Sequence, residues 1–205
     1  VMALFPGTVD AAVRAAIAMH QQVRELNAVR RGDGEEAIRI GVGLHHGTLM
    51  LGTIGETERM DSTVISDAVN TSSRLEGLTK SYGAPILISG PTLAMCAEPR
   101  AFRSRWLGDV RPRGRASLVA LHEIYEPLDP AVADLRDQTK PAMEEAIRHF
   151  LAREWSDARR LFIEVMAVDS GDLAARAFLE RADANAQKPD VGTTTTLGTL
   201  DVTLL

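Results

Sequence analysis

The sequence has little cysteine, few aromatic residues and no long apolar run. Its 205 residues include one cysteine, Cys96, so no disulfide can form within the chain, and a reducing, cytoplasmic location is expected. No window approaches the ~18 uninterrupted apolar residues that a membrane helix needs, and no signal-peptide pattern opens the chain. We therefore expect no membrane contact from this segment.

Positive charge is also scarce. The 28 acidic and 23 basic residues give a formal charge of −5, so no overall positive field exists to hold nucleic acid, and no nucleic-acid partner is expected. Hydrophobic residues make up 45% and charged residues 25%, which are ordinary proportions for a globular protein and exclude wholesale disorder. Cys96 lies in an apolar run and is expected to be a small buried side chain rather than a nucleophile.

The chain opens on an apolar run, Val1–Phe5, that ends at Pro6 and Gly7. Such a run is typical of a strand that ends in a turn. Because the sequence thus starts inside an element, it is interpreted as a fragment whose natural N-terminal part is absent.

Hydrophobic periodicity then predicts mixed helices and strands up to about residue 125. Helices are expected at 9–30, from 67 to about 80, and at 91–96. Strands are expected at 38–44, 48–54, 62–65, 86–88, 102–110 and 117–125. The short separation of the first two strands favours an antiparallel hairpin, and Gly41 and Gly43 are expected to allow close packing across the sheet.

Two prolines, Pro127 and Pro130, mark the best domain boundary. Helices are predicted after it at 131–152, 155–168 and 171–185. The spacing of Trp155, Ala158 and Phe162 resembles a single tetratricopeptide-like helical hairpin. One copy cannot bury both its faces, so it is expected to pack on the first domain or on another chain. Residues 187–205 are predicted to be a flexible tail, with an added strand as the alternative.

The residues that favour a specific chemistry lie on the predicted helix at 67–80. Asn70 and Arg74 are four residues apart, about 40° around the helix axis, so they share a face. Ser73 and Gly77 lie on the same side, whereas the packed side is predicted to consist of Ala68, Ser72, Leu75 and Thr79. An arginine on an outer helix face is usually only a solvated charge, and this is the alternative from spacing alone.

Three motifs around this helix resemble class III nucleotide cyclases, which make 3′,5′-cyclic nucleotides from nucleoside triphosphates. They are Ile40–Gly47, Leu51–Gly55 and Asp67–Glu76, and the similarity covers about residues 1–125. It implies a ferredoxin-like α+β cyclase domain, incomplete at its N-terminus, over residues 1–126. A small all-α segment at 127–186 and the tail at 187–205 follow.

The resemblance also implies roles for four residues in converting ATP to cyclic AMP and pyrophosphate. Arg74 matches the transition-state arginine that contacts the α-phosphate, and Asn70 matches the asparagine that orients the ribose. Thr63 falls where the family reads the purine, and Arg113 falls where it usually has a lysine for the terminal phosphates. A threonine hydroxyl accepts from the adenine amino group and favours ATP only modestly, so a guanylate cyclase is the alternative.

Mg²⁺ or Mn²⁺ and a second subunit are further implications of the resemblance. The two aspartates that hold the metal in the family are expected upstream of Val1, so no metal ligand is assigned in this chain and the fragment alone is expected to be inactive. The intact protein is expected to be a homodimer in which this chain supplies the ribose- and phosphate-binding half of a composite site. A non-catalytic, cyclase-like nucleotide-binding or regulatory module is the alternative from another class.

Overall fold

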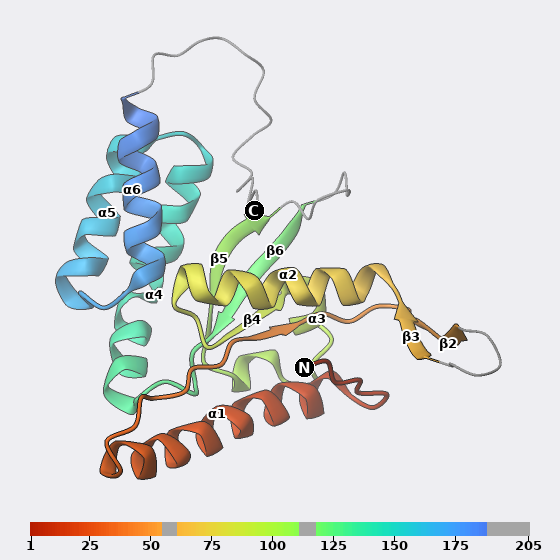
Figure 1. The fold of residues 1–205 in the computed structure, drawn as a ribbon. Helices are drawn as coiled ribbons and strands as arrows, with labels where there is room; N and C mark the ends of the chain where they lie inside the picture. The colour runs from red at the N-terminus through yellow and green to blue at the C-terminus, as the bar shows by residue number, and fades with distance from the viewer. Residues whose placement is uncertain (55–60, 111–117, 188–205) are drawn as a thin grey trace.

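A four-stranded sheet lies at the centre of the computed structural model, which describes residues 1–54, 61–110 and 118–187 (Figure 1). Its strands, in spatial order, are β1 (Val42–Leu44), β4 (Ile86–Ser89), β6 (Val119–Ile124) and β5 (Ser104–Val110). β1 runs parallel to β4, and the other neighbours are antiparallel. With helices before, between and after these strands, the predicted α+β class is confirmed.

A separate antiparallel pair consists of β2 (Met50–Ile54) and β3 (Asp61–Ile65). The predicted hairpin between the strands at 38–44 and 48–54 is therefore wrong, because β1 pairs with β4 instead. The chain does not reverse after β1: the His45 imidazole hydrogen-bonds to Ser89 Oγ at 2.7 Å, and the His46 N–H donates to Thr92 Oγ1 at 2.8 Å. These bonds hold the backbone beside the end of β4 before it continues into β2.

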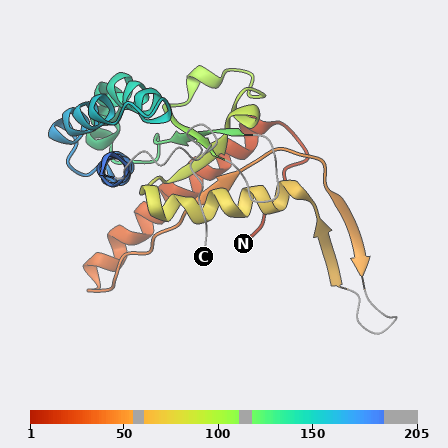
Figure 2. The same ribbon diagram turned by 90° about the horizontal axis from the view of Figure 1, so that it is seen from above.

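Helices cover both faces of the sheet (Figures 1 and 2). On one face, Ile86 and Ile88 pack with Val13 and Ile17 of α1 (Val9–Gly32). On the other, Leu87 packs with α2 (Asp67–Tyr82) and with three C-terminal helices. These are α4 (Pro130–Leu151), α5 (Trp155–Val168) and α6 (Leu173–Ala186). Alternate side chains of one buried strand thus serve two cores.

The strand interpretation of the opening run Val1–Phe5 is wrong, because these residues have no regular secondary structure, and the other predicted helices and strands are found close to their expected bounds. Only Val42–Leu44 of the stretch 38–44 is a strand, and the helix expected at 91–96 is the short α3 (Gly90–Leu93), followed by a 3₁₀ turn at Pro99–Ala101. Cys96 is buried as expected, and burial raises the pKa of its thiol. Within the described residues, no helix is long and apolar enough to cross a membrane.

A buried ion network joins the C-terminal helices to the sheet. Arg105 on β5 donates to Glu123 on β6 at 2.6 Å and to both carboxylate oxygens of Asp172, which caps α6, at 2.5 and 3.0 Å. Arg136 on α4 pairs with Asp172 and Asp169. Burial alone would raise the pKa of Asp172, but the two guanidinium groups lower it to about 2. The helical segment therefore packs on the first 126 residues, which was one of its two expected positions, the other being a second chain.

Candidate functional site

Helix α2 is the element that presents the candidate site residues, and both its ends are fixed. At its N-terminus the Ser66 hydroxyl accepts from the Ala68 N–H at 3.0 Å and donates to the Thr48 carbonyl at 2.6 Å. At its C-terminus Gly83 has φ +61°, the left-handed conformation that glycine adopts at helix ends. Helix position is thereby tied to the chain that leads from β1 into β2.

The first half of α2 lies directly on the backbone of β1. A Cβ at Gly43 would stand 2.2 Å from the Ser72 carbonyl oxygen and 2.4 Å from the Glu76 amide nitrogen. These atoms belong to the turns that carry Asn70 and Arg74. The close packing expected of Gly43 is therefore found, but against the helix that covers the sheet.

The predicted division of α2 into two faces is confirmed. Ala68, Leu75 and Thr79 are buried and Ser72 is half-buried, while Asn70, Ser73 and Gly77 are exposed and Arg74 is half-buried. Four residues of helix separate Asn70 from Arg74 by about 6 Å along the axis. A side-chain amide and a guanidinium are thus offered together on the side of α2 away from the core.

Thr63 lies close to the start of α2 in the sequence. It lies on β3 opposite Gly52, three residues before the N-cap Ser66. Figures 1 and 2 show the β2–β3 pair projecting from the sheet beside the end of α2 where the helix begins. The backbone therefore brings Thr63 to the same end of α2 as Asn70. Arg113 lies outside the described residues.

Sequence reasoning missed the polar group that fixes the exit from β1. Ser89 is fully buried, and its hydroxyl lies 2.6 Å from Thr92 Oγ1 and 2.7 Å from the His45 ring. The Ser-Gly-Pro turn after β4 was the only sequence signal for it. In the described ranges no three His, Cys, Asp or Glu side chains gather as a metal site, so the residues present there do not fit the metal that the resemblance implies.

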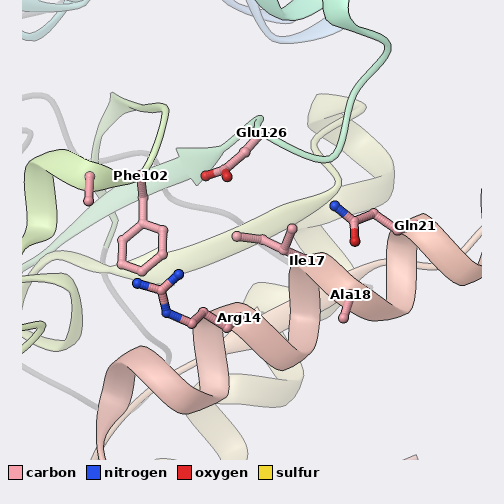
Figure 3. Close-up of a pocket in the computed structure, with 7 residues that line it drawn as sticks. Arg14, Ile17, Ala18, Gln21, Phe102 and Glu126 are labelled. Carbon is pink, nitrogen blue, oxygen red and sulfur yellow. The ribbon is translucent and has the colours of Figure 1, made fainter.

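A cavity of 270 Å³ lies on the opposite face of the sheet from α2 (Figure 3). It is lined by residues of α1, by Ala101 and Phe102, and by Glu126. The Arg14 guanidinium stands 5.6 Å from the centroid of the Phe102 ring. Because α1 and α2 cover different faces, this cavity is not where Asn70 and Arg74 are presented.

Comparison with protein families gives one match that covers more than half of the chain. The family described as "Adenylate and Guanylate cyclase catalytic domain" matches residues 5–123. The match ends before α4 begins at Pro130, so the three C-terminal helices lie outside it.

Individual relatives agree with this match. An adenylate cyclase of Anabaena cylindrica is 41% identical over 130 residues, 60% of this chain and 26% of that protein. Adenylate cyclase 1 of Rhizobium meliloti is 35% identical over 113 residues, 55% of this chain and 17% of that protein. The chain thus spans about a quarter or less of these curated relatives. Among solved structures, the adenylyl cyclase CyaB from P. aeruginosa is 30% identical, with a TM-score of 0.49 over 57% of this chain and 58% of that one.

Proposed function

Because the chain belongs to the family of adenylate and guanylate cyclase catalytic domains, we propose that the complete protein converts ATP into 3′,5′-cyclic AMP and pyrophosphate. In this proposal the chain supplies the contacts to ribose and α-phosphate. The observation that carries it is the placement of Asn70 and Arg74 together on the outward side of a helix that packs on the backbone of Gly43 in β1. The relatives named adenylate cyclase support ATP rather than GTP as the substrate.

The chemistry requires a positioned ribose and a stabilised phosphoryl group. The ribose 3′ oxygen attacks the α-phosphorus and gives its proton to water, while the bond from the α-phosphorus to the oxygen bridging to the β-phosphate breaks and its electron pair leaves with pyrophosphate. Negative charge grows on the phosphoryl oxygens, and preorganised donors meet it best. Arg74 offers a planar guanidinium that suits phosphate oxygens, and Asn70 hydrogen-bonds the ribose and orients its 3′ oxygen.

Purine and terminal phosphates are assigned to two further residues. Thr63 would accept a hydrogen bond from the adenine amino group. Arg113 would hold the terminal phosphates with its charge, in place of the lysine that is usual in the family. Both assignments rest on the register of the motifs around α2.

Divalent metal and a second subunit complete the proposal. Members of the family generally use divalent metal ions, and Mg²⁺ or Mn²⁺ would neutralise the triphosphate and favour attack by the 3′ oxygen. The described residues do not form a site for such an ion, and no step above depends on one. We place the complementary half of the site on a second copy of the protein, as a homodimer, and the single cysteine favours a cytoplasmic location.

The decisive experiment measures cyclic AMP formation by the complete protein with Mn²⁺-ATP. Arg74→Ala should lower the rate by about 100-fold or more, since one preorganised donor to the developing charge is lost. Lys80→Ala is the matched control, because this exposed cation lies on the same helix in its last turn. An unchanged rate in Arg74→Ala would contradict the role of Arg74. If the wild-type protein forms no cyclic nucleotide, the non-catalytic alternative stands instead.

Base selection is tested by comparing ATP with GTP in wild type and Thr63→Val. Valine keeps the shape of threonine but removes the hydroxyl, so kcat/KM for ATP should fall about tenfold while the value for GTP changes less. A wild-type protein that prefers GTP would favour the guanylate cyclase alternative.

A further inference from the structure

The last turn of α2 is enclosed by α6. Tyr82 is 1% exposed and stacks on Phe178, with ring centroids 5.9 Å apart and planes 12° apart. The Arg181 guanidinium lies 5.9 Å from the centroid of the Tyr82 ring and donates to its hydroxyl at 3.3 Å. A Cβ at Gly83 would meet the Leu173 side chain at 2.7 Å. Contacts of Tyr82 and Gly83 with three side chains of α6 therefore fix the end of α2 against this helix.

The same helix is fixed at its own N-terminus to the sheet. Asp172 accepts the Ala175 N–H as the N-cap of α6 and receives two hydrogen bonds from Arg105 of β5. Charge-assisted, bidentate bonds of this kind are strong and geometrically specific. Helix α6 is thus a brace between strand β5 and the end of α2. In Figure 1 the lower half of α6 lies beside this end of α2.

Movement at the braced end reaches the candidate site because α2 is one continuous helix. Arg74 lies eight residues before Tyr82, which is about 12 Å along the axis. A misplacement of only ~1 Å at reacting groups can cost about 100-fold in rate. The orientation of Asn70 and Arg74 therefore depends on how α6 holds the other end.

We propose that α6 orients α2 for the reaction, with Tyr82, Phe178 and Arg181 as positioning residues for Asn70 and Arg74. This inference rests on the proposed function and extends it, because α6 lies outside the family match, which ends at residue 123. In this proposal the C-terminal helices support the helix that carries Asn70 and Arg74.

Arg181→Ala tests the brace with little risk to folding, since the Arg181 side chain is half-exposed. In the complete protein we expect kcat for cyclic AMP formation to fall about two- to fivefold, the loss that matches one partly exposed cation–π contact, with KM for ATP nearly unchanged. Amide hydrogen exchange in the last turns of α2 should become faster. Arg181→Lys keeps a cation and a donor over Tyr82 and should restore most of both properties.

Arg159→Ala is the matched control. It breaks an ion pair between α5 and α6, Arg159 to Asp183 at 2.8 Å, and leaves the contacts to α2 intact. Wild-type kcat and wild-type protection of α2 in Arg181→Ala would overturn the proposal, as would an equal loss in Arg159→Ala, which would mark a general effect of the helical segment.

Hydrogen exchange separates this inference from the proposed function. If the complete protein forms no cyclic nucleotide, the proposed function fails, while exchange in α2 still decides the brace. Loss of amide protection in α2 that occurs in Arg181→Ala but not in Arg159→Ala supports the brace, and unchanged protection in Arg181→Ala overturns it.

Discussion

The two halves of α2 are held in opposite ways. The first half, which carries Asn70 and Arg74, rests on β1 at a point where no side chain intervenes, since a Cβ at Gly43 would lie within 2.4 Å of two backbone atoms of the helix. The second half ends at Tyr82, which is held by large aromatic side chains of the C-terminal helices.

This difference decides what each half tolerates. Where a glycine lets two backbones touch, a larger side chain is not tolerated, because backbone cannot move aside as a flexible side chain does. Where stacked aromatic rings make the contact, truncation of a ring destabilises the fold, because the deleted ring leaves a cavity. Missing side chains thus set the approach of α2 to the chain around β1, at Gly43 and also at Gly41 beside Thr79, whereas abundant side chains hold only its last turn.

Removal from the aromatic half should have the largest effect on stability. Phe178 is fully buried, stacks on Tyr82 and Phe162, and meets Phe150 edge to face. Phe178→Ala should lower the free energy of unfolding by about 3–5 kcal/mol, measured by urea denaturation. Phe178→Leu, which fills more of the space, should lose clearly less; equal losses in the two variants would contradict a packing role for the ring.

Adding a methyl group at Gly43, where β1 contacts α2, should cost less stability but more activity. Gly43→Ala places a methyl group against the Ser72 carbonyl, and relief of that overlap should cost about 1–3 kcal/mol of unfolding free energy. The shift falls between Asn70 and Arg74, so the rate of cyclic AMP formation by the complete protein should fall further than the lost stability explains. Normal stability and rate in Gly43→Ala would show that α2 and β1 are not in backbone contact.

The sequence predicted helix α2 better than it predicted the elements that α2 contacts. Helical periodicity predicted α2 and both its faces, because that signal is local. The glycines of β1 indicated close packing but not its partner, since a strand pattern does not say which element covers it. Pairing of β1 with β4 was mispredicted for the same reason: proximity in the chain favoured β2, whereas the structure pairs β1 with β4 and bonds His45 to Ser89 at the end of β4 and His46 to Thr92.

The Arg105–Asp172 contact was likewise beyond sequence reasoning, because its partners are 67 residues apart and each resembles an ordinary surface charge. What the sequence did predict of the candidate site was the pair on one helix, Asn70 and Arg74. Thr63 and Arg113 depended on the register of the family motifs, and Arg113 lies outside the described residues.

Acid should weaken the aromatic half by loosening α6 from the sheet. The pKa of Asp172 is about 2 in the folded chain, against an ordinary value of 3.8, so its carboxylate stabilises the fold fully above about pH 4. That contribution, about 2 kcal/mol by linkage, is lost as the pH falls from 3.8 towards 2. Urea unfolding at several pH values measures it, and Asp172→Asn should remove this part of the pH dependence; a wild-type slope in that variant would assign the effect to other carboxylates.

The smallest change tests the outward side of α2, beyond Arg74. Gly77 lies on the outward side of α2 and a Cβ there meets nothing within 4 Å, so Gly77→Ala should stabilise the chain by about 0.5–1 kcal/mol through helix propensity. Gly43→Ala adds the same methyl group to strand β1, where it would meet the backbone of α2, whereas the methyl group of Gly77→Ala points away from other elements. Opposite signs in urea unfolding would therefore confirm that overlap with the backbone of α2 sets the cost at Gly43. A more stable Gly77→Ala chain with a slower reaction in the complete protein would show that this outward side is covered while the reaction takes place.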